Sequence, residues 1–273
     1  MHITMKKSIL FSLCIMAGLC WTSCEKEPTT AEETAETSED LALAQNMLQT
    51  TEEEVDLLLE TRSGDNEDCP TVTFTPDATS FPRTVTIDYG TEGCPGPHGY
   101  IRKGVIQIDI SDSMSVPGAS RTKTFIDFSI DEVSILGTKT LTYVGLNEDQ
   151  QKVWNRSVVD AQLLFPGGEE VSWNAEQTIT KIEGQETDVL LDDVFQITGN
   201  SSGINRQGNP FTSSITDPLI KPRNCRWPVS GTREAMVNDR SRSLDYGDGN
   251  CDRNATVTWS NGFSRDILLR RWW

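Results

Sequence analysis

Four cysteines in the body of the chain have the spacing that most directly suggests chemistry. Cys69 and Cys94 are 25 residues apart, and Cys225 and Cys251 are 26 apart. The second cysteine of each pair follows an Asp-Tyr-Gly triplet at the same distance, in DYGTEGC and in DYGDGNC, and we expect the Asp and the Tyr to end a strand in each copy. In an oxidising compartment an even number of cysteines indicates disulfides. Three pairings are possible, and the matched spacing favours Cys69–Cys94 and Cys225–Cys251. A zinc site would require close Cys-x-x-Cys pairs, which the sequence lacks.

The second copy of the motif also raises the question of calcium. Asp248, Asn250 and Asp252 stand at alternate positions, as in the first half of a calcium loop. However, Arg253 replaces the glycine expected after the third ligand, and Trp259 replaces the closing glutamate. A tight turn explains the same residue types. We therefore predict no metal ligands and no cofactor, and calcium at this triplet stays open as the alternative.

Residues for catalysis are hard to single out. After removal of an N-terminal signal the chain retains one histidine, His98, in the loop CPGPHGY. No nucleophile elbow, phosphate-binding loop or dinucleotide fingerprint is present. Glycoside hydrolysis requires only two carboxylates, but none of the many acids forms a distinguishable pair. These acids include Asp127, Asp131, Glu132, Glu169, Glu170 and Glu176. We predict no catalytic residues.

Tryptophans are the remaining candidates for contact with a ligand. Four tryptophans lie within or beside strand-like segments, where tryptophan is usually part of the core: Trp154, Trp173, Trp227 and Trp259. The chain ends in RRWW, so Trp272 and Trp273 are candidate ligand contacts that could stack on a sugar. The alternative is a terminal strand that packs one of the two rings against the sheet.

Residues 1–24 have the layout of a secretory signal. MHITMKK carries two lysines, SILFSLCIMAGL is an apolar run, and small polar residues follow. The run is too short for a permanent membrane span. WTSC resembles a lipobox and predicts lipidation of Cys24, so that acyl chains anchor the protein to a membrane.

Residues 25–68 form an acidic arm. They contain 15 acids against Lys26 and Arg62, a net charge of −13, whereas the whole chain carries −17. The composition is typical of a solvated tether. Apolar residues between Leu41 and Arg62 have roughly helical spacing, which predicts short amphipathic helical turns in a partly disordered arm. The acidic charge argues against nucleic acid as a partner.

Residues 69–273 have the pattern of an all-β domain. Segments such as KGVIQIDIS and TKTFIDFSI alternate apolar and polar residues, are rich in Val, Ile, Thr and Phe, and are separated by turn signals. This predicts an antiparallel sheet of about 10–12 strands, as a sandwich, a barrel or a curved open sheet. The domain contains the duplicated Asp-Tyr-Gly motif, and we expect a disulfide to hold each copy in place. Among the predicted turns is GNSSGINRQGNP, which starts at Gly199.

A family resemblance rests on the order of several motifs. FPRTVTIDYG, the segment GYIRKGVIQI, then GTKTLTYVG and finally DYGDGNCDRNATVTWSNG occur in sequence over roughly Cys69 to Leu269. This arrangement resembles uncharacterised exported lipoproteins of Bacteroidetes. The resemblance implies a β-structured, outer-membrane lipoprotein without a known activity.

We therefore expect a lipid-anchored outer-membrane protein on the periplasmic or the cell-surface side. Its expected role is a non-enzymatic binding or structural module for a glycan or an envelope protein. The alternatives are a carboxylate-based glycan hydrolase and a periplasmic structural or carrier lipoprotein.

Overall fold

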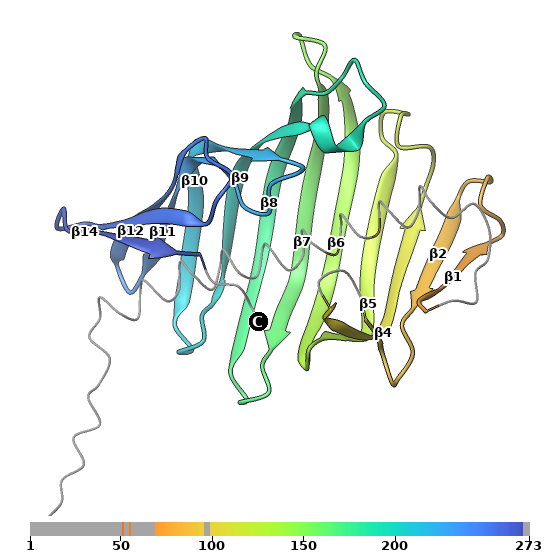
Figure 1. The fold of residues 1–273 in the computed structure, drawn as a ribbon, viewed down its shortest axis with the longest axis horizontal. Coiled ribbons are helices and arrows are strands. Elements are labelled where there is room, and N and C mark those ends of the chain that lie inside the picture. Colours follow the sequence, from red (N-terminus) through yellow and green to blue (C-terminus); the bar gives the residue numbers. More distant parts are fainter. Residues whose placement is uncertain (1–50, 52–54, 56–68, 96–98, 270–273) are drawn as a thin grey trace, which may run out of the picture.

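One antiparallel β sheet makes up the described part of the protein. The computed structural model describes Thr51, Val55 and residues 69–95 and 99–269. The sheet has 14 strands, which follow one another in chain order except that β3 pairs with β4 beside this path. Figure 1 shows them in one layer, from β1 at one edge to β14 near the other.

The strands lengthen toward the middle of the sheet. The first seven are β1 (Thr71–Thr75), β2 (Arg83–Asp88), β3 (Cys94–Pro95), β4 (Ile101–Ile110), β5 (Ser120–Ile130), β6 (Val133–Leu146) and β7 (Lys152–Leu164). The others are β8 (Glu170–Glu183), β9 (Val194–Ile204), β10 (Pro210–Pro222), β11 (Ser230–Val237), β12 (Arg240–Asp248), β13 (Asn254–Trp259) and β14 (Ser264–Leu268). A 3-10 turn, η2 (Leu190–Asp192), lies between β8 and β9.

The all-β prediction is confirmed, and of the three predicted architectures the open sheet is observed, because the strand order does not close. The strand number exceeds the predicted 10–12. Strands β10 and β11 were missing from the prediction because polar residues dominate them. In β11 and β12, moreover, Arg233 and Arg242 occupy buried positions where an apolar residue is expected.

The two faces of the sheet differ as the alternation predicts. Ile106, Ile108 and Ile110 of β4 point to one face, where they are 1%, 0% and 4% exposed. We call this the inner face. The outer face carries Thr, Ser, Asn and acidic residues that hydrogen-bond between neighbouring strands. For example, the hydroxyl groups of Thr122 on β5 and Thr140 on β6 are 3.2 Å apart.

The inner face is buried although the described strands form a single layer. Trp173 of β8 is 1% exposed and Leu163 of β7 is 0% exposed. Two residues of the arm are described, and both have helical backbone: Thr51, 1% exposed, and Val55, 0% exposed. Val55 belongs to the same hydrophobic cluster as Trp173. The helical prediction is met at these two positions, and the other residues of the arm lie outside the described ones.

The prediction of a turn from Gly199 onward is wrong for the first half of that segment. Gly199 and Gly203 lie inside β9, and the turn begins only after Ile204. A Cβ atom would lie 2.2 Å from the Glu176 carbonyl oxygen at Gly199 and 1.9 Å from the Ser172 carbonyl oxygen at Gly203. The glycines therefore permit the backbones of β8 and β9 to approach closely rather than turning the chain.

Both predicted disulfides are present. Cys69 bonds to Cys94, and Cys225 bonds to Cys251. The first ties the segment before β1 to β3, and the second ties the β10–β11 connection to the β12–β13 turn. Each disulfide therefore fastens strands near one end of the open sheet, where a strand has fewer neighbours than in the middle.

The two Asp-Tyr-Gly motifs share one local structure. Gly90 donates its backbone N–H to the Asp88 carboxylate at 2.7 Å, and Gly247 donates to Asp245 at 2.8 Å. The tyrosine between each pair is buried. We predicted that the Asp and the Tyr end a strand. In the first copy β2 does end at Asp88, but in the second copy β12 continues to Asp248 because its pairing with β11 shifts register between Ser230 and Thr232.

Candidate binding site

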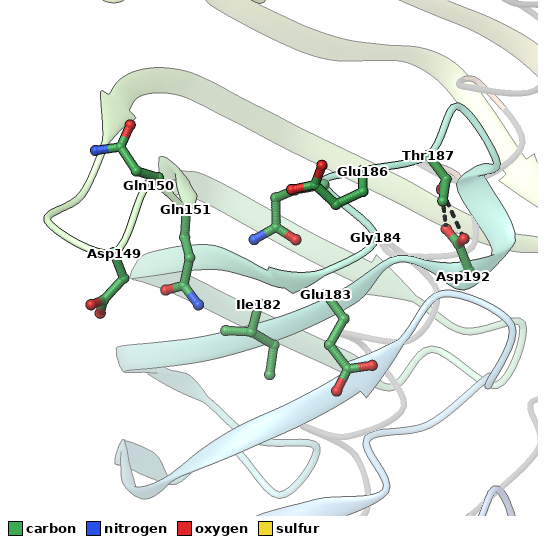
Figure 2. A pocket seen from close by; sticks show the side chains of 10 residues that line it. Asp149, Gln150, Gln151, Ile182, Glu183, Gly184, Glu186, Thr187 and Asp192 are labelled. Carbon is green, nitrogen blue, oxygen red and sulfur yellow. Dashed lines mark hydrogen bonds between the residues drawn. The ribbon is translucent and has the colours of Figure 1, made fainter.

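A polar pocket lies at one end of the long central strands. It has a volume of about 560 Å³ and lies between the β6–β7 turn and the segment that joins β8 to β9. Figure 2 shows the turn, with Asp149, Gln150 and Gln151, on one side and the segment with Glu186, Thr187 and Asp192 on the other. Ile182 and Glu183, at the end of β8, lie between them.

The lining of the pocket is rich in planar polar groups. Four carboxylates and three amides line it, together with one apolar side chain. These residues are Asp149, Glu183, Glu186 and Asp192, then Gln150, Gln151 and Gln185, and Ile182. Carboxylates accept hydrogen bonds, while amides both donate and accept, so this lining suits a ligand with many hydroxyl groups. Among the residues that the structure describes, no cation lines the pocket, and its charge therefore favours neutral or cationic ligands over anions.

The β8–β9 segment is held in place by its own contacts. Gln185 donates from its side-chain amide to the Lys181 carbonyl oxygen at 2.7 Å. The Thr187 hydroxyl donates to the Asp192 carboxylate, with oxygen–oxygen distances of 2.7 and 2.9 Å. Gly184, with φ +84°, turns the chain at the end of β8. One wall of the pocket is therefore formed without a ligand.

A buried ion pair fixes the far end of the same segment. The Lys181 ammonium lies 2.5 Å from one Asp193 carboxylate oxygen, and the Arg223 guanidinium lies 3.7 Å from the other. The side chain of Asp193 is only 4% exposed. The Arg223 backbone N–H also donates to the Asp193 carbonyl oxygen at 2.8 Å. Loss of the Asp193 carboxylate would remove the anion that both Lys181 and Arg223 face, so these ion pairs restrict the segment to one position.

Aromatic rings support the strands at this end of the sheet. Trp154 of β7 lies 5.6 Å from Tyr143 of β6 and 6.4 Å from Phe195 of β9, measured between ring centroids. Trp154 packs against rings of neighbouring strands but is only half-buried, whereas Trp173 is buried in the core as predicted.

The structure does not bring the predicted site residues to the pocket. Cys24, His98, Trp272 and Trp273 lie outside the described residues. The six acids considered for hydrolysis are all exposed and do not line the pocket. Two of them have local partners: Asp131 accepts the Ile101 backbone N–H at 2.8 Å, and Glu176 accepts the Ser157 hydroxyl at 2.5 Å.

The Asp248, Asn250 and Asp252 triplet forms local hydrogen bonds. Asn250 donates to Asp248 at 2.7 Å, and Asn254 donates to Asp252 from its backbone and side-chain nitrogens at 2.8 and 2.7 Å. These bonds are those of an Asx-rich turn. Among the residues that the structure describes, no three His, Cys, Asp or Glu side chains are arranged to hold a metal ion.

Sequence reasoning missed the pocket because its residues come from two turns that only the pairing of β6, β7 and β8 brings together. It also missed a set of buried cations on the inner face. The alternation of the strands could have indicated these lysines. Lys123 precedes Phe125 by two residues and Lys139 precedes Tyr143 by four, so each lysine lies on the same face of its strand as a buried aromatic residue.

Comparisons with protein-family models, with curated proteins and with solved structures found no match. In the described ranges, no helix is long and apolar enough to cross a membrane.

Proposed function

We propose that the protein is a lipid-anchored outer-membrane protein that binds a hydroxyl-rich glycan in the polar pocket. The observation that carries this proposal is the lining of four carboxylates and three amides on a segment whose shape is fixed by internal contacts. Because the described lining of the pocket contains carboxylates and no cation, amino sugars should bind better than uronic acids. The lipobox and the acidic arm support the anchored location.

The test is binding to an array that contains neutral, amino-sugar and uronic-acid oligosaccharides. Glu183→Gln with Glu186→Gln removes two pocket carboxylates while preserving side-chain size. Glu169→Gln with Glu170→Gln is the matched control, because these exposed residues lie at the other end of β8 and carry the same charge. We expect the pocket variant to lose at least about tenfold in affinity, the equivalent of one charged hydrogen bond, and the control to bind normally. An array without any signal would contradict the proposal.

The same oligosaccharides separate binding from hydrolysis. We expect them to be recovered intact after incubation with the protein. Turnover that Glu183→Gln abolishes would instead favour the carboxylate-based hydrolase.

Location is tested by protease treatment of intact cells, with lysed cells as the control. Loss of the protein from intact cells would place it on the cell surface. Protection until lysis would place it on the periplasmic side and favour a structural or carrier role.

A further inference from the structure

The pocket wall formed by the β8–β9 segment is joined to the turn that holds Cys225. Asp193 directly follows Asp192 of the pocket lining and pairs with Lys181 and Arg223. Arg223 stands two residues before Cys225 in the β10–β11 connection. Its backbone N–H donates to the Asp193 carbonyl oxygen, so that both the side chain and the main chain of Arg223 fasten the segment to this connection.

The turn around Arg223 is itself closed by hydrogen bonds. The Cys225 backbone N–H donates to the Pro222 carbonyl oxygen at 3.1 Å. The Lys221 ammonium donates to the Pro222 carbonyl oxygen, also at 3.1 Å, and to that of Cys225. Lys221 and Cys225 are buried, where such bonds are strong. The position of Arg223 therefore depends on that of Cys225, which the disulfide ties to Cys251 in the β12–β13 turn.

Gly184 transmits the position of Asp193 to the pocket lining. Gly184 lines the pocket, and a Cβ atom there would lie 2.6 Å from Asp193 Oδ1 and 3.0 Å from Asp192 Oδ1. Because the two carboxylates lie this close to the glycine, a shift of Asp193 must displace Gly184 or Asp192. A shift of Asp192 would also move Thr187, whose hydroxyl donates to it.

The first disulfide lies at the opposite end of the strands. Cys94 of β3 is opposite Arg102 of β4. Arg102 is opposite Ile130 of β5, and Ile130 is opposite Val133 at the start of β6. The pocket lies beyond Leu146, at the other end of β6. Two disulfides with nearly the same spacing in the sequence therefore differ in their relation to the pocket.

We propose that the Cys225–Cys251 disulfide positions the pocket wall through Arg223 and Asp193, so that the pocket takes its binding shape only when this disulfide is formed. The inference rests on the proposed function for its ligand, but its effect on the wall can be measured without a ligand. Apparent affinity falls in proportion to the fraction of molecules whose site has the binding shape. The second disulfide is therefore part of the binding site as well as a clamp on its end of the sheet.

The test compares removal of the two disulfides in the full chain. Cys225→Ser with Cys251→Ser removes the second disulfide. Cys69→Ser with Cys94→Ser is the matched control, because the first disulfide closes a loop of almost the same length and its loss should cost similar stability. Without ligand, we expect amide hydrogen exchange at residues 184–193 to become several-fold faster when the second disulfide is removed and to stay unchanged in the control. Equal exchange of this segment in the two variants, whether raised or unchanged, would overturn the proposal.

Binding of a chitosan hexamer, an amino-sugar oligosaccharide, separates this inference from the proposed function. We expect removal of the second disulfide to weaken binding at least about threefold and removal of the first to leave it unchanged. Equal losses of affinity would contradict a specific link between the second disulfide and the pocket. If the wild type does not bind the hexamer while exchange changes as expected, the proposed function fails and the positioning of the wall stands.

Arg223→Gln tests the same contact with the disulfide intact, in case the serine variant does not fold. Arg240→Gln is its control, because Arg240 is an exposed residue at the start of β12. We expect faster exchange at residues 184–193 in Arg223→Gln alone. Combined with loss of the second disulfide, Arg223→Gln should add less than its separate effect, because both changes act on one contact. Unchanged exchange in Arg223→Gln, or full additivity, would overturn the proposed route through Arg223.

Discussion

Gly104 shows how one residue can determine the path of two strands. Its φ is +82°, and a Cβ atom there would lie 2.1 Å from the Asp127 carbonyl oxygen on β5. The Gly104 carbonyl oxygen accepts the Tyr89 N–H at 2.9 Å, which joins β4 to the first Asp-Tyr-Gly motif. The position therefore excludes side chains both by conformation and by contact with the backbone.

Gly104→Ala should lower the free energy of unfolding by more than about 2 kcal/mol, because backbone strain and a steric clash add. Gly262→Ala is the control, since Gly262 has φ +83° but no atom within 4 Å of its ideal Cβ. Gly262→Ala should lower the free energy of unfolding by only about 1–2 kcal/mol, which is the cost of placing alanine in a left-handed conformation. Urea denaturation measures both values, and equal losses would show that the β4–β5 contact is unimportant.

Arg233 is a buried cation whose removal should be tolerated. It is 4% exposed, and in the described part of the chain its Nε and Nη1 atoms form no hydrogen bond. Burial lowers the pKa of Arg233, which the nearby Tyr246 partly offsets. Arg233→Met should raise the free energy of unfolding by about 1 kcal/mol, because the apolar side chain fills the space without the cost of burying a charge. A loss of stability in urea denaturation would contradict this account.

Tyr246 makes stability depend on pH in the alkaline range. Burial raises the pKa of Tyr246 above its ordinary value of 10.0, and the charge of Arg233 reduces that shift. A raised pKa means that the fold favours the neutral phenol, so this contribution to stability is complete below pH 10.0 and is lost as the pH rises toward the pKa of the folded state. Tyr246→Phe should flatten the decline in melting midpoint above about pH 10. An unchanged profile would contradict this prediction.

Among the elements, the two disulfides act where strands have the fewest neighbours. Each closes a loop of about 26 residues, for which chain entropy predicts about 3–4 kcal/mol of stabilisation. Cys225→Ser with Cys251→Ser should therefore lower the free energy of unfolding by this amount in urea. Unchanged stability would mean that the packing of β11–β14 alone holds this end of the sheet.

The sequence predicts the strands well where alternation is regular and poorly where charge interrupts it. Strands β4, β5 and β6 were predicted because Ile, Phe and Val recur at every second position. Strand β11 was missed, and β12 was predicted only at its Asp245-Tyr246 end, because buried arginines take such positions. Strand β9 was shortened because glycine usually indicates a turn. The pairing of the cysteines could be predicted because the two pairs have nearly the same spacing in the sequence. The pocket could not be predicted, because it depends on which strands are neighbours in the sheet, and no local sequence pattern specifies that order.

At the scale of the whole molecule, an open sheet must protect its edges and its apolar face. The strands at the two edges, β1 and β14, have only five residues each, which limits pairing with another chain. On the inner face, the two described residues of the arm, Thr51 and Val55, are buried, and Val55 belongs to the core cluster. The pocket then remains at one end of the central strands, on turns that face solvent.

Binding of a glycan in the polar pocket can be measured by hydrogen–deuterium exchange with and without a chitosan hexamer. The account predicts slower exchange, in the presence of the oligosaccharide, in the turn at residues 147–151 and in the segment at residues 182–192. The β7–β8 turn at residues 165–169, at the opposite end of the strands, should exchange at an unchanged rate. Unchanged exchange in both pocket segments at saturating oligosaccharide, or protection confined to other parts of the sheet, would contradict the claim.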